Sequence, residues 1–379
     1  MSFVQDIKLS RKPLAGFLAI GVAWAAFFAQ MPVIKAQVGA TDGAYGVAIL
    51  VSSIGALAAM WLAPMCRRFA GGNAVPLGIA VLAIGMFCAG ASGGLVVLML
   101  AMMLAAAGSG VIDVLINARI SEIEAESGRN LMNLNHALYS FAYAGGALIV
   151  GVFRSAGGGP LLIMVALVFL LGLLALAARD VAPPPEQDTS GSIAGFPNLL
   201  VILTGLIVLT AFLTEAATEG WSALHLERTL GGSPAQGALG PALLGLMMGI
   251  GRLFGHGLSR FVRDTWLMLA ASLVASSGVV LAGLAPTVSL ALLGFAIAGL
   301  GVSVVVPLAM AFIGRVVAPA HRLAAISRAS VIGYGAFFFG PPLMGLVAQG
   351  FGLRAAFVTV AALLVVTAIV LIPALARRS

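Results

Sequence analysis

Residues 160–178 read PLLIMVALVFLLGLLALAA, an apolar run that contains no charged residue and ends before Arg179. A helix of about 20 such residues is long enough to cross the roughly 30 Å of hydrocarbon in a bilayer. The whole chain is 61% hydrophobic and only 9% charged, whereas soluble domains carry about 25% charged residues. No water-soluble fold of this length could bury so much apolar surface, so the composition predicts an integral membrane protein.

Similar apolar windows recur along the chain, each bounded by charges, Pro, Gly or short polar turns. We therefore predict an all-α integral membrane protein with twelve transmembrane helices. The 48 glycines fit this fold, because small residues let membrane helices pack closely. The predicted spans are 13–34, 44–63, 75–93, 96–118, 131–152, 160–178, 197–221, 239–259, 265–285, 288–314, 324–348 and 354–375.

The segment after the sixth predicted span is polar and rich in proline, with Pro183, Pro184 and Pro185 followed by Glu186. This composition is typical of a flexible connection. It divides the chain into two pseudo-symmetric six-helix bundles. The predicted parts are an N-terminal bundle at 1–178, a cytoplasmic linker at 179–196 and a C-terminal bundle at 197–379.

The basic residues predict the orientation of the chain, because cytoplasmic loops of membrane proteins carry an excess of Lys and Arg. An even number of spans puts both termini on one side, and nearly all of the 20 Lys and Arg fall on that side. The exceptions are Lys35, Arg154, Arg228 and Arg354. We therefore expect a multi-pass protein of the cell inner membrane with both termini in the cytoplasm.

The loops after the second and eighth spans carry a recognisable pattern. Residues 64–72 read PMCRRFAGG, and residues 249–260 read GIGRLFGHGLSR. With the six-plus-six architecture, these loops resemble the major facilitator superfamily, which has Gly, an acidic residue and basic residues there. The first loop departs from the family, because Arg67 lies near the place of the acidic residue. The resemblance implies a cytoplasmic latch between the halves, with candidates Gly251, Arg252, Gly255 and Arg260.

Three short motifs are similar to the fucose-permease-like branch of that superfamily and its uncharacterised bacterial relatives. They are GVID at 110–113 with Asn117, LNHALYS at 134–140 and EGWSA at 219–223. The resemblance implies a proton-linked carrier of a polar solute, in which an acidic residue of the fourth span takes part in proton coupling. It does not imply fucose as the substrate.

Three carboxylates lie inside predicted spans: Asp113 in the fourth, and Glu215 and Glu219 in the seventh. A carboxylate at bilayer depth costs about 2.5–3.5 kcal/mol on insertion scales, so each is expected to face a cavity or a partner. We predict that they take part in proton coupling. The alternative is a structural hydrogen bond, or a position nearer the lipid headgroups.

Polar residues of the fourth and fifth spans share helix faces. Asp113 and Asn117 are four residues apart on one face. A polar stripe at three-to-four-residue spacing follows the fifth span; it consists of Asn133, His136, Tyr139, Ser140 and Tyr143. If the two faces meet, they form a polar cluster in the cytoplasmic half of the membrane, with Asp113 at the depth of His136 and Asn117 at the depth of Asn133. His136, the fourth proton-coupling candidate, either exchanges a proton there or simply forms an interhelical hydrogen bond.

Glu215 and Glu219 also share a face. They lie about 27–33 Å along the helix from Pro197, toward the outer side and outside the layer of Asp113. Two carboxylates one turn apart repel each other when both are charged, which favours a protonatable pair. Trp221 either stacks on a solute or closes an outer gate, or it is one of the tryptophans common at membrane interfaces.

The leading prediction is a secondary active transporter that moves a small polar solute by alternating access and proton symport. Proton-coupled efflux of a drug or metabolite by antiport would use the same carboxylates. A non-transporting receptor or scaffold is an alternative of another class, although a scaffold has no need for three embedded acids. The substrate-pathway candidates are Asn117, Asn133, Tyr139, Tyr143 and Trp221.

The sequence argues against several other classes of function. It has no nucleotide loop, nucleophile elbow or metal-ligand helix motif, so we expect no enzyme and no cofactor. Cys66 and Cys88 make no metal-binding pattern, and the scattered basic residues make no stripe for nucleic acid. The expected partners are a small-molecule substrate, protons and the lipid bilayer, with the chain acting as a monomer.

Overall fold

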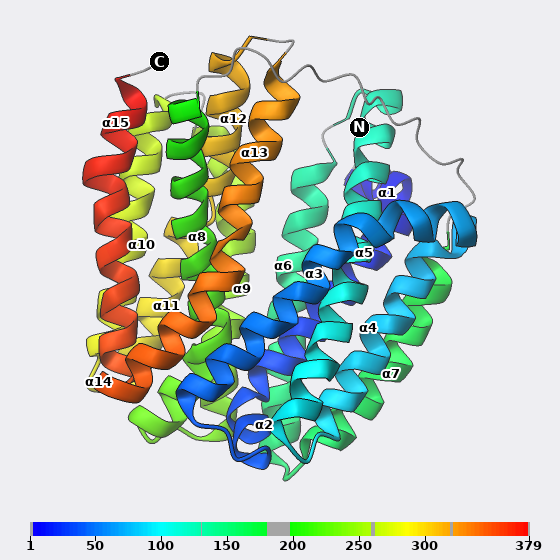
Figure 1. Ribbon diagram of the computed structural model, residues 1–379, viewed down its shortest axis with the longest axis vertical. Helices are drawn as coiled ribbons and strands as arrows, with labels where there is room; N and C mark the ends of the chain where they lie inside the picture. Colours follow the sequence, from blue (N-terminus) through cyan, green and yellow to red (C-terminus); the bar gives the residue numbers. More distant parts are fainter. Residues whose placement is uncertain (1–2, 130, 180–197, 259–261, 319–320, 378–379) are drawn as a thin grey trace.

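Long helices form the regular structure of the chain, as the computed structural model shows (Figure 1). The structure describes residues 3–129, 131–179, 198–258, 262–318 and 321–377. The helices of the first half are α1 (Phe3–Ala29), α2 (Met31–Gln37), α3 (Asp42–Ala70), the 3₁₀ turn η1 (Gly71–Asn73), α4 (Ala74–Gly90), α5 (Leu95–Ser127), α6 (Met132–Ser155) and α7 (Pro160–Ala177). The second half has α8 (Asn198–Leu224), the π-helical turn η2 (His225–Thr229), α9 (Pro234–Leu258), α10 (Asp264–Leu284), α11 (Val288–Val302), α12 (Val305–Val316), α13 (Arg322–Tyr334), α14 (Ala336–Val366), the π-helical turn η4 (Thr367–Leu371) and α15 (Ile372–Ala376).

Within the described residues these helices make twelve passes through the bundle, which confirms the predicted fold class. The last three passes combine helices: α11 with α12, α13 with the first part of α14, and the rest of α14 with α15. Gly352, with a φ of 84°, turns the chain between the last two passes. By length and composition alone, ten stretches of the described residues qualify as membrane spans, and one of them, Ala325–Ala376, contains two passes.

Several spans differ from their predicted form. The first, predicted from residue 13, begins at Phe3, and the eleventh is divided between α13 and α14. The tenth is interrupted between α11 and α12 at Ser303, and Pro307 lies in the first turn of α12, where a missing backbone N–H is tolerated. The fourth, predicted to end at residue 118, continues as a helix to Ser127. The turns after residue 118 are polar and contain the Arg119–Glu122 ion pair of 2.8 Å. The helix therefore continues beyond its apolar stretch.

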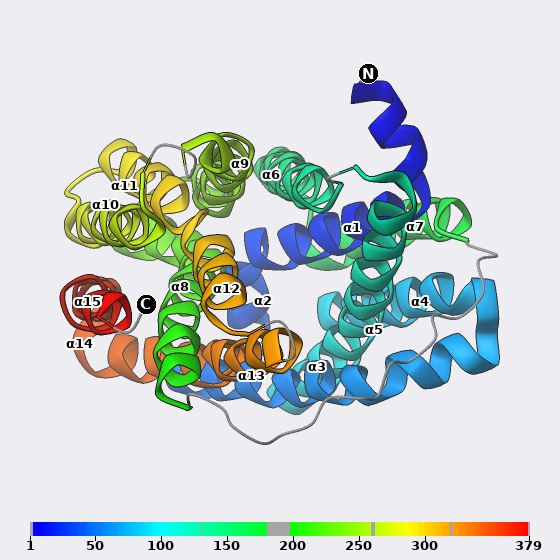
Figure 2. The same ribbon diagram turned by 90° about the horizontal axis from the view of Figure 1, so that it is seen from above.

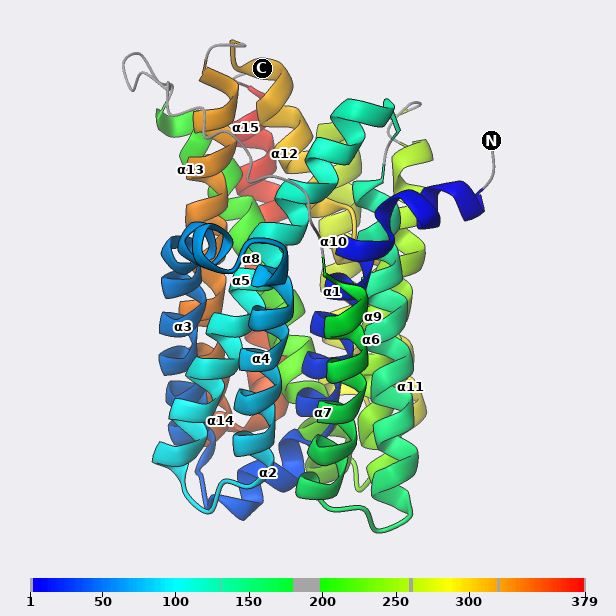
Figure 3. The same ribbon diagram turned by 90° about the vertical axis from the view of Figure 1, so that its right-hand side faces the viewer.

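The passes form two groups of helices that lie side by side (Figure 2). Both chain ends lie on one face of the bundle, here called the terminal face (Figure 1). The short helix α2 lies at the other end, the opposite face (Figure 3). This arrangement agrees with an even number of passes. The predicted linker, apart from Arg179, lies outside the described residues.

The two halves contact each other along α6 with α9 and along α3 with α14. Glycine makes the second contact close. A Cβ on Gly46 would lie 2.5 Å from the carbonyl oxygen of Pro341, and a Cβ on Gly345 would lie 2.5 Å from that of Asp42. Both distances are too short for any larger residue without movement of a helix.

Candidate functional site

A polar cluster joins α5 to α6, as the sequence predicted, although with a different pairing. Asn117 donates from Nδ2 to Asp113 Oδ1 at 2.9 Å and to the Asp113 carbonyl at 2.8 Å. His136 Nε2 lies 3.3 Å from Asn117 Oδ1. Asn133, which was expected at the depth of Asn117, is exposed near the start of α6. The helix register thus sets His136, one turn further along, against Asn117.

Arg252 of α9 connects the second half to this cluster. Its Nη1 donates to Ser140 Oγ of α6 at 2.9 Å, and its Nη2 lies 3.7 Å from Glu215 Oε1 of α8. Ser140 Oγ in turn donates to the His136 carbonyl at 3.0 Å. A short path of polar contacts therefore runs from the embedded acid of α8 to the polar stripe of α6.

The sequence placed Glu215 and Glu219 outside the layer of Asp113. Arg252 lies about 9 Å inside the terminal-face end of α9, six residues before Leu258. Its guanidinium, 3.7 Å from Glu215 and 2.9 Å from Ser140, is the contact that joins the glutamate of α8 to the polar stripe of α6.

Tyr143 lies one turn beyond Tyr139, with the ring centroids 6.4 Å apart. Its hydroxyl is buried and has no hydrogen-bond partner among the described protein atoms. Buried polar groups in folded proteins are nearly always satisfied by protein or water. The Tyr143 hydroxyl is therefore a group that a small polar molecule could satisfy.

Aromatic side chains gather in each half beside this polar cluster. Trp24 of α1 stacks on Phe28 with centroids 5.5 Å apart, and its Nε1 donates to Ser109 Oγ at 3.0 Å. In the second half, Tyr334 stacks on Phe212 at 5.6 Å. Tyr334 is 42% exposed, so protein atoms cover its ring only in part.

Two ion pairs link the halves at the opposite face, and both start from η2. Arg154, at the end of α6, makes two hydrogen bonds to Glu227, of 2.7 and 2.8 Å, and also donates to the Ala29 carbonyl at 2.8 Å. Arg228 makes two bonds to Asp42 at the start of α3, of 2.8 and 2.6 Å. Consecutive residues of one π-helical turn thus hold two different helices of the other half.

The two opposite-face ion pairs differ in their contact with water. The Arg154 side chain is 3% exposed, whereas that of Arg228 is 44% exposed. Asp42 has a second cationic partner, Lys35, at 2.9 Å. The Arg154–Glu227 pair is therefore the one whose loss leaves a buried charge uncompensated.

The sequence reasoning did not single out these ion pairs. It treated Arg154 and Arg228 only as scarce basic residues of the outer side. The signal that could have indicated the ion pairs is that the acids Asp42 and Glu227 are predicted on the same outer side as these two basic residues. Which cation meets which acid depends on contacts over 73 and 186 residues of sequence, which composition does not reveal.

Trp221 belongs to the same region. It is 2% exposed and packs edge-on against Tyr45 of the other half, with the ring centroids 5.7 Å apart. This is a contact between halves and not a position among lipid headgroups. Nearby, Gly43 N donates to Gln349 Oε1 at 2.9 Å, which adds a further link across the opposite face.

The predicted latch residues lie in different places. A Cβ on Gly251 would lie 2.1 Å from Ser303 Oγ, so this glycine lets α9 approach the break between α11 and α12. Arg252 is engaged with Glu215 and Ser140. Gly255 lies in the last turns of α9, and Arg260 lies outside the described residues.

Twelve passes in two six-helix halves, with ionisable groups of both halves converging between them, define the fold of a helical membrane carrier. The chain belongs to the major facilitator superfamily. Residues 204–379 match the Major Facilitator Superfamily. Over 362 residues the chain is 32% identical to an uncharacterised MFS-type transporter of Yersinia pestis, with 94% of this chain and 92% of the relative covered. This confirms a multi-pass membrane transporter rather than an enzyme.

Solved structures share the fold over nearly the whole chain. A D-xylose-proton symporter has a TM-score of 0.75 at 15% identity, covering 98% of this chain and 97% of its own. A bacterial homologue of the human lysosomal transporter Spinster, inward-facing and unoccupied, has a TM-score of 0.73 at 16% identity, covering 100% and 98%. At these identities the likeness is one of fold alone.

Proposed function

We propose that this transporter moves a small polar solute by proton-coupled symport. The observation that carries the proposal is the position of Arg252, which contacts Glu215 of its own half and, through Ser140, the polar stripe of the first half that holds His136. Ionisable groups are costly in a membrane and are retained mainly on substrate or proton pathways. Because these groups come from both halves, any movement of the halves changes the electrostatic surroundings of the Arg252 side chain between them. Proton coupling requires this link between movement and charge.

The roles follow from the contacts. Asp113 carries the proton, with Glu215, 3.7 Å from Arg252, and Glu219 as a second protonatable pair. His136, which lies against the amide oxygen of Asn117, would exchange its own proton with the cavity. These roles agree with the proposed place of the chain in the fucose-permease-like branch, whose fourth-span acid takes part in coupling.

Solute contacts are proposed for the polar groups between the halves. Tyr139 and Asn117 would bind the solute, and Tyr143 would donate its otherwise unsatisfied hydroxyl. Asn133, exposed near the start of α6, would meet the solute at the entrance. A carrier of this fold works by rocking its halves about such a midplane site.

The contacts of the opposite face supply the outer closure in this proposal. The Arg154–Glu227 and Asp42–Arg228 pairs and the Trp221–Tyr45 contact hold the halves together there. We propose that the terminal face is cytoplasmic, since most Lys and Arg belong to that side. The described conformation would then be closed to the outside of the inner membrane.

Efflux by antiport is a second candidate, and the aromatic side chains favour it. Phe212, stacked on Tyr334, lies three residues before Glu215 on α8, and rings beside carboxylates attract organic cations. The same groups would then exchange protons for a cationic, partly apolar solute.

Liposomes that contain the purified protein and carry an imposed pH gradient test both candidates. Sugars, organic acids, amines and dyes are offered, and uptake is followed with and without a protonophore. Symport predicts accumulation on the alkaline side of the membrane. Antiport predicts accumulation on the acidic side. A solute whose flux ignores the gradient in either direction would remove proton coupling from the mechanism.

A further inference from the structure

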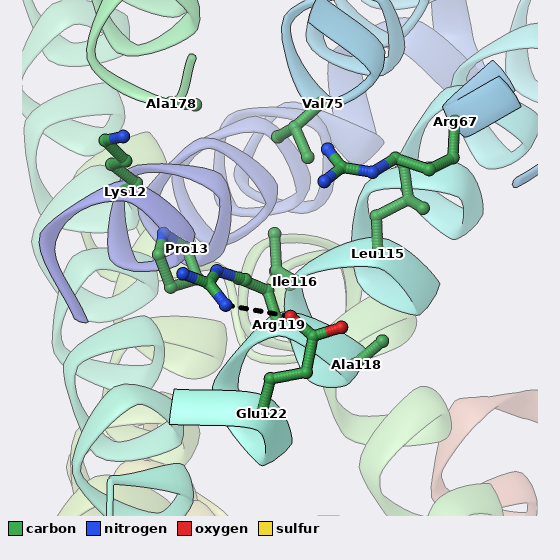
Figure 4. Close-up of a pocket in the computed structure, with 10 residues that line it drawn as sticks. All are labelled: Lys12, Pro13, Arg67, Val75, Leu115, Ile116, Ala118, Arg119, Glu122 and Ala178. Carbon is green, nitrogen blue, oxygen red and sulfur yellow. Dashed lines mark hydrogen bonds and ion pairs between the residues drawn. The ribbon is translucent and has the colours of Figure 1, made fainter. Parts of the chain in front are cut away.

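The arginines that pair with a carboxylate do so at different distances. In a pocket at the terminal-face end of the first half, Arg119 bonds Glu122 at 2.8 Å (Figure 4). The two ion pairs of the opposite face each have two hydrogen bonds, between 2.6 and 2.8 Å long. Arg252 instead lies 3.7 Å from Glu215, which is beyond hydrogen-bond distance. The charge of Arg252 is therefore only loosely paired.

The guanidinium of Arg252 has unused hydrogen-bond donors. A guanidinium carries five N–H groups, and one of them donates from Nη1 to Ser140 Oγ at 2.9 Å. Within the described part of the chain, the other donors have no acceptor at hydrogen-bond distance. The side chains of Arg252 and Glu215 are 17% and 15% exposed, although both lie inside the bundle. A small anion could therefore reach these donors, and arginine binds carboxylates through such N–H groups.

Close packing of α9 on α6 sets the place of Arg252 between the halves. Gly249 lies three residues before Arg252, and a Cβ on it would lie 3.1 Å from Ser140 Cβ. Because α9 approaches α6 so closely there, an arginine of the second half reaches a serine of the first. A solute bound to Arg252 would contact both halves, as an alternating-access carrier requires.

The opposite face carries more positive than negative charge. All of its charged residues belong to the described part of the chain; the cations are Lys35, Arg154, Arg228 and Arg354, and the carboxylates are Asp42 and Glu227. A surplus of one sign of charge at an entrance raises the local concentration of ions of the other sign. The Arg228 side chain is 44% exposed, so part of this charge faces water. The face that closes the proposed outer entrance therefore attracts anions.

We propose that the transported solute carries a carboxylate and that Arg252 binds it in place of Glu215. This inference rests on the proposed function, because it names the class of solute for the same site. A proton taken up by the Glu215 carboxylate removes its negative charge and leaves the guanidinium to the carboxylate of the solute. When the solute departs, Glu215 releases the proton and pairs with Arg252 again. Proton and anion are thus bound in the same step.

Few charged groups face Glu215 from the helices around it. Arg252 approaches from α9, and Glu219 lies one turn further along α8. The helices α13 and α14 also pack on α8, and their residues 329–353 contain Tyr334 but no charged residue. Charged residues of the other helices that contact α8 lie near one or the other face. Among these groups, Glu219 favours protonation of its neighbour by repulsion, and Arg252 is left to bind the anion.

Thermal unfolding of the purified full-length protein tests the binding step without knowledge of the solute. Acetate is the simplest carboxylate, acetamide and methylammonium are its neutral and cationic counterparts, and sodium chloride controls for ionic strength. At neutral pH, acetate should stabilise Glu215→Gln, in which Arg252 has lost its competitor, and should not stabilise Glu215→Gln/Arg252→Gln. Glu126→Gln is the matched control, because its side chain is 71% exposed, and it should respond as the wild type does. No acetate effect in Glu215→Gln overturns the proposal.

A metabolite library at acidic pH tests the class of solute. It contains carboxylates, their amides, amines and polyols, and the compounds that stabilise the wild type should carry a carboxylate. Arg252→Gln should weaken their binding at least about tenfold, because hydrogen bonds between charged groups contribute that much. Arg252→Lys keeps the charge and should weaken it less; it also replaces Arg252→Gln if that variant does not fold. A neutral or cationic stabiliser, or unchanged binding in Arg252→Gln, overturns the proposal.

Uptake of the stabilising compounds into liposomes separates this inference from the proposed symport. A neutral or cationic compound that the pH gradient drives inward would overturn the carboxylate assignment and leave proton symport intact. A carboxylate that depends on Arg252 but ignores the gradient would keep the binding residue and remove the symport.

Discussion

Asp113 is the embedded acid whose local contacts are most fully defined, because both its side chain and its carbonyl accept from Asn117. Replacement by asparagine keeps the size and one acceptor oxygen, so the α5–α6 contact survives. What is lost is the ability to take up and release a proton.

We therefore expect Asp113→Asn to abolish accumulation driven by a pH gradient, while exchange of solute across the membrane continues. The measurement is uptake into liposomes with and without the gradient, beside counterflow of labelled solute. Glu126→Gln is the matched control, since Glu126 lies on the same helix with its side chain 71% exposed. Gradient-driven uptake that persists in Asp113→Asn would exclude this carboxylate from coupling.

The two opposite-face ion pairs give a second prediction at this scale. Removing one partner of a fully buried pair costs about 3–5 kcal/mol, whereas an exposed pair contributes about 0–1 kcal/mol. Glu227→Gln leaves the buried guanidinium of Arg154 without its counter-charge. After Arg228→Gln, by contrast, Asp42 still has Lys35 as a cationic partner. Glu227→Gln should therefore open the opposite face far more than Arg228→Gln.

Spin labels on the opposite face measure this difference. Cysteines at Ala36 and Ser289, both exposed and in different halves, are introduced after Cys66 and Cys88 are replaced by serine. The distance between the labels should lengthen strongly in Glu227→Gln and little in Arg228→Gln. The reverse order would mean that the buried pair does not hold the closed state.

At the scale of helices, the α3–α14 contact is the tightest described approach of the two halves, with Gly46 against Pro341. A valine at Gly46 cannot fit while both helices keep their places. The halves must move apart at this crossing, which lies near the opposite face.

We expect Gly46→Val to lengthen the Ala36–Ser289 label distance and to lower the transport rate. Gly172→Val in α7 is the control, because no atom lies within 4 Å of a Cβ there. Gly46→Ala should give a smaller change in the same direction. Transport and distances that match the wild type in Gly46→Val would show that the helices accommodate the side chain without separation.

The helices also show what the sequence determines and what it leaves open. The spans follow from apolar length, and several were predicted within a few residues, for example 160–178 against Pro160–Ala177. Where a helix continues beyond its apolar stretch the prediction fell short, since α1 begins at Phe3 and not at 13, and α5 ends at Ser127 and not at 118. Asn117 lies against His136 and not against Asn133. This was not predictable, because composition does not set the register between antiparallel helices. Ion pairs between distant parts of the chain, such as Asp42 with Arg228, depend on how the halves dock.

At the scale of the whole molecule, the shared face of the two termini and the skewed distribution of basic residues predict an orientation with that face in the cytoplasm. We expect green fluorescent protein fused to the C-terminus to fluoresce, since it folds only in the cytoplasm. Alkaline phosphatase fused after Gly93, between α4 and α5, should be active, since this turn lies at the opposite face. The inverse pattern would place the opposite face in the cytoplasm.

The unequal exposure of Arg154 and Arg228 also means that the two attachments respond differently to the ionic strength of the medium. Dissolved ions screen charges over about 8 Å at physiological concentration, but only where water carries them to the pair. A high salt concentration outside the membrane would weaken the Asp42–Arg228 ion pair and leave the Arg154–Glu227 ion pair almost unchanged. The opposite face of the carrier would then open more easily at high ionic strength, while the Arg154–Glu227 ion pair would still hold the two halves together there.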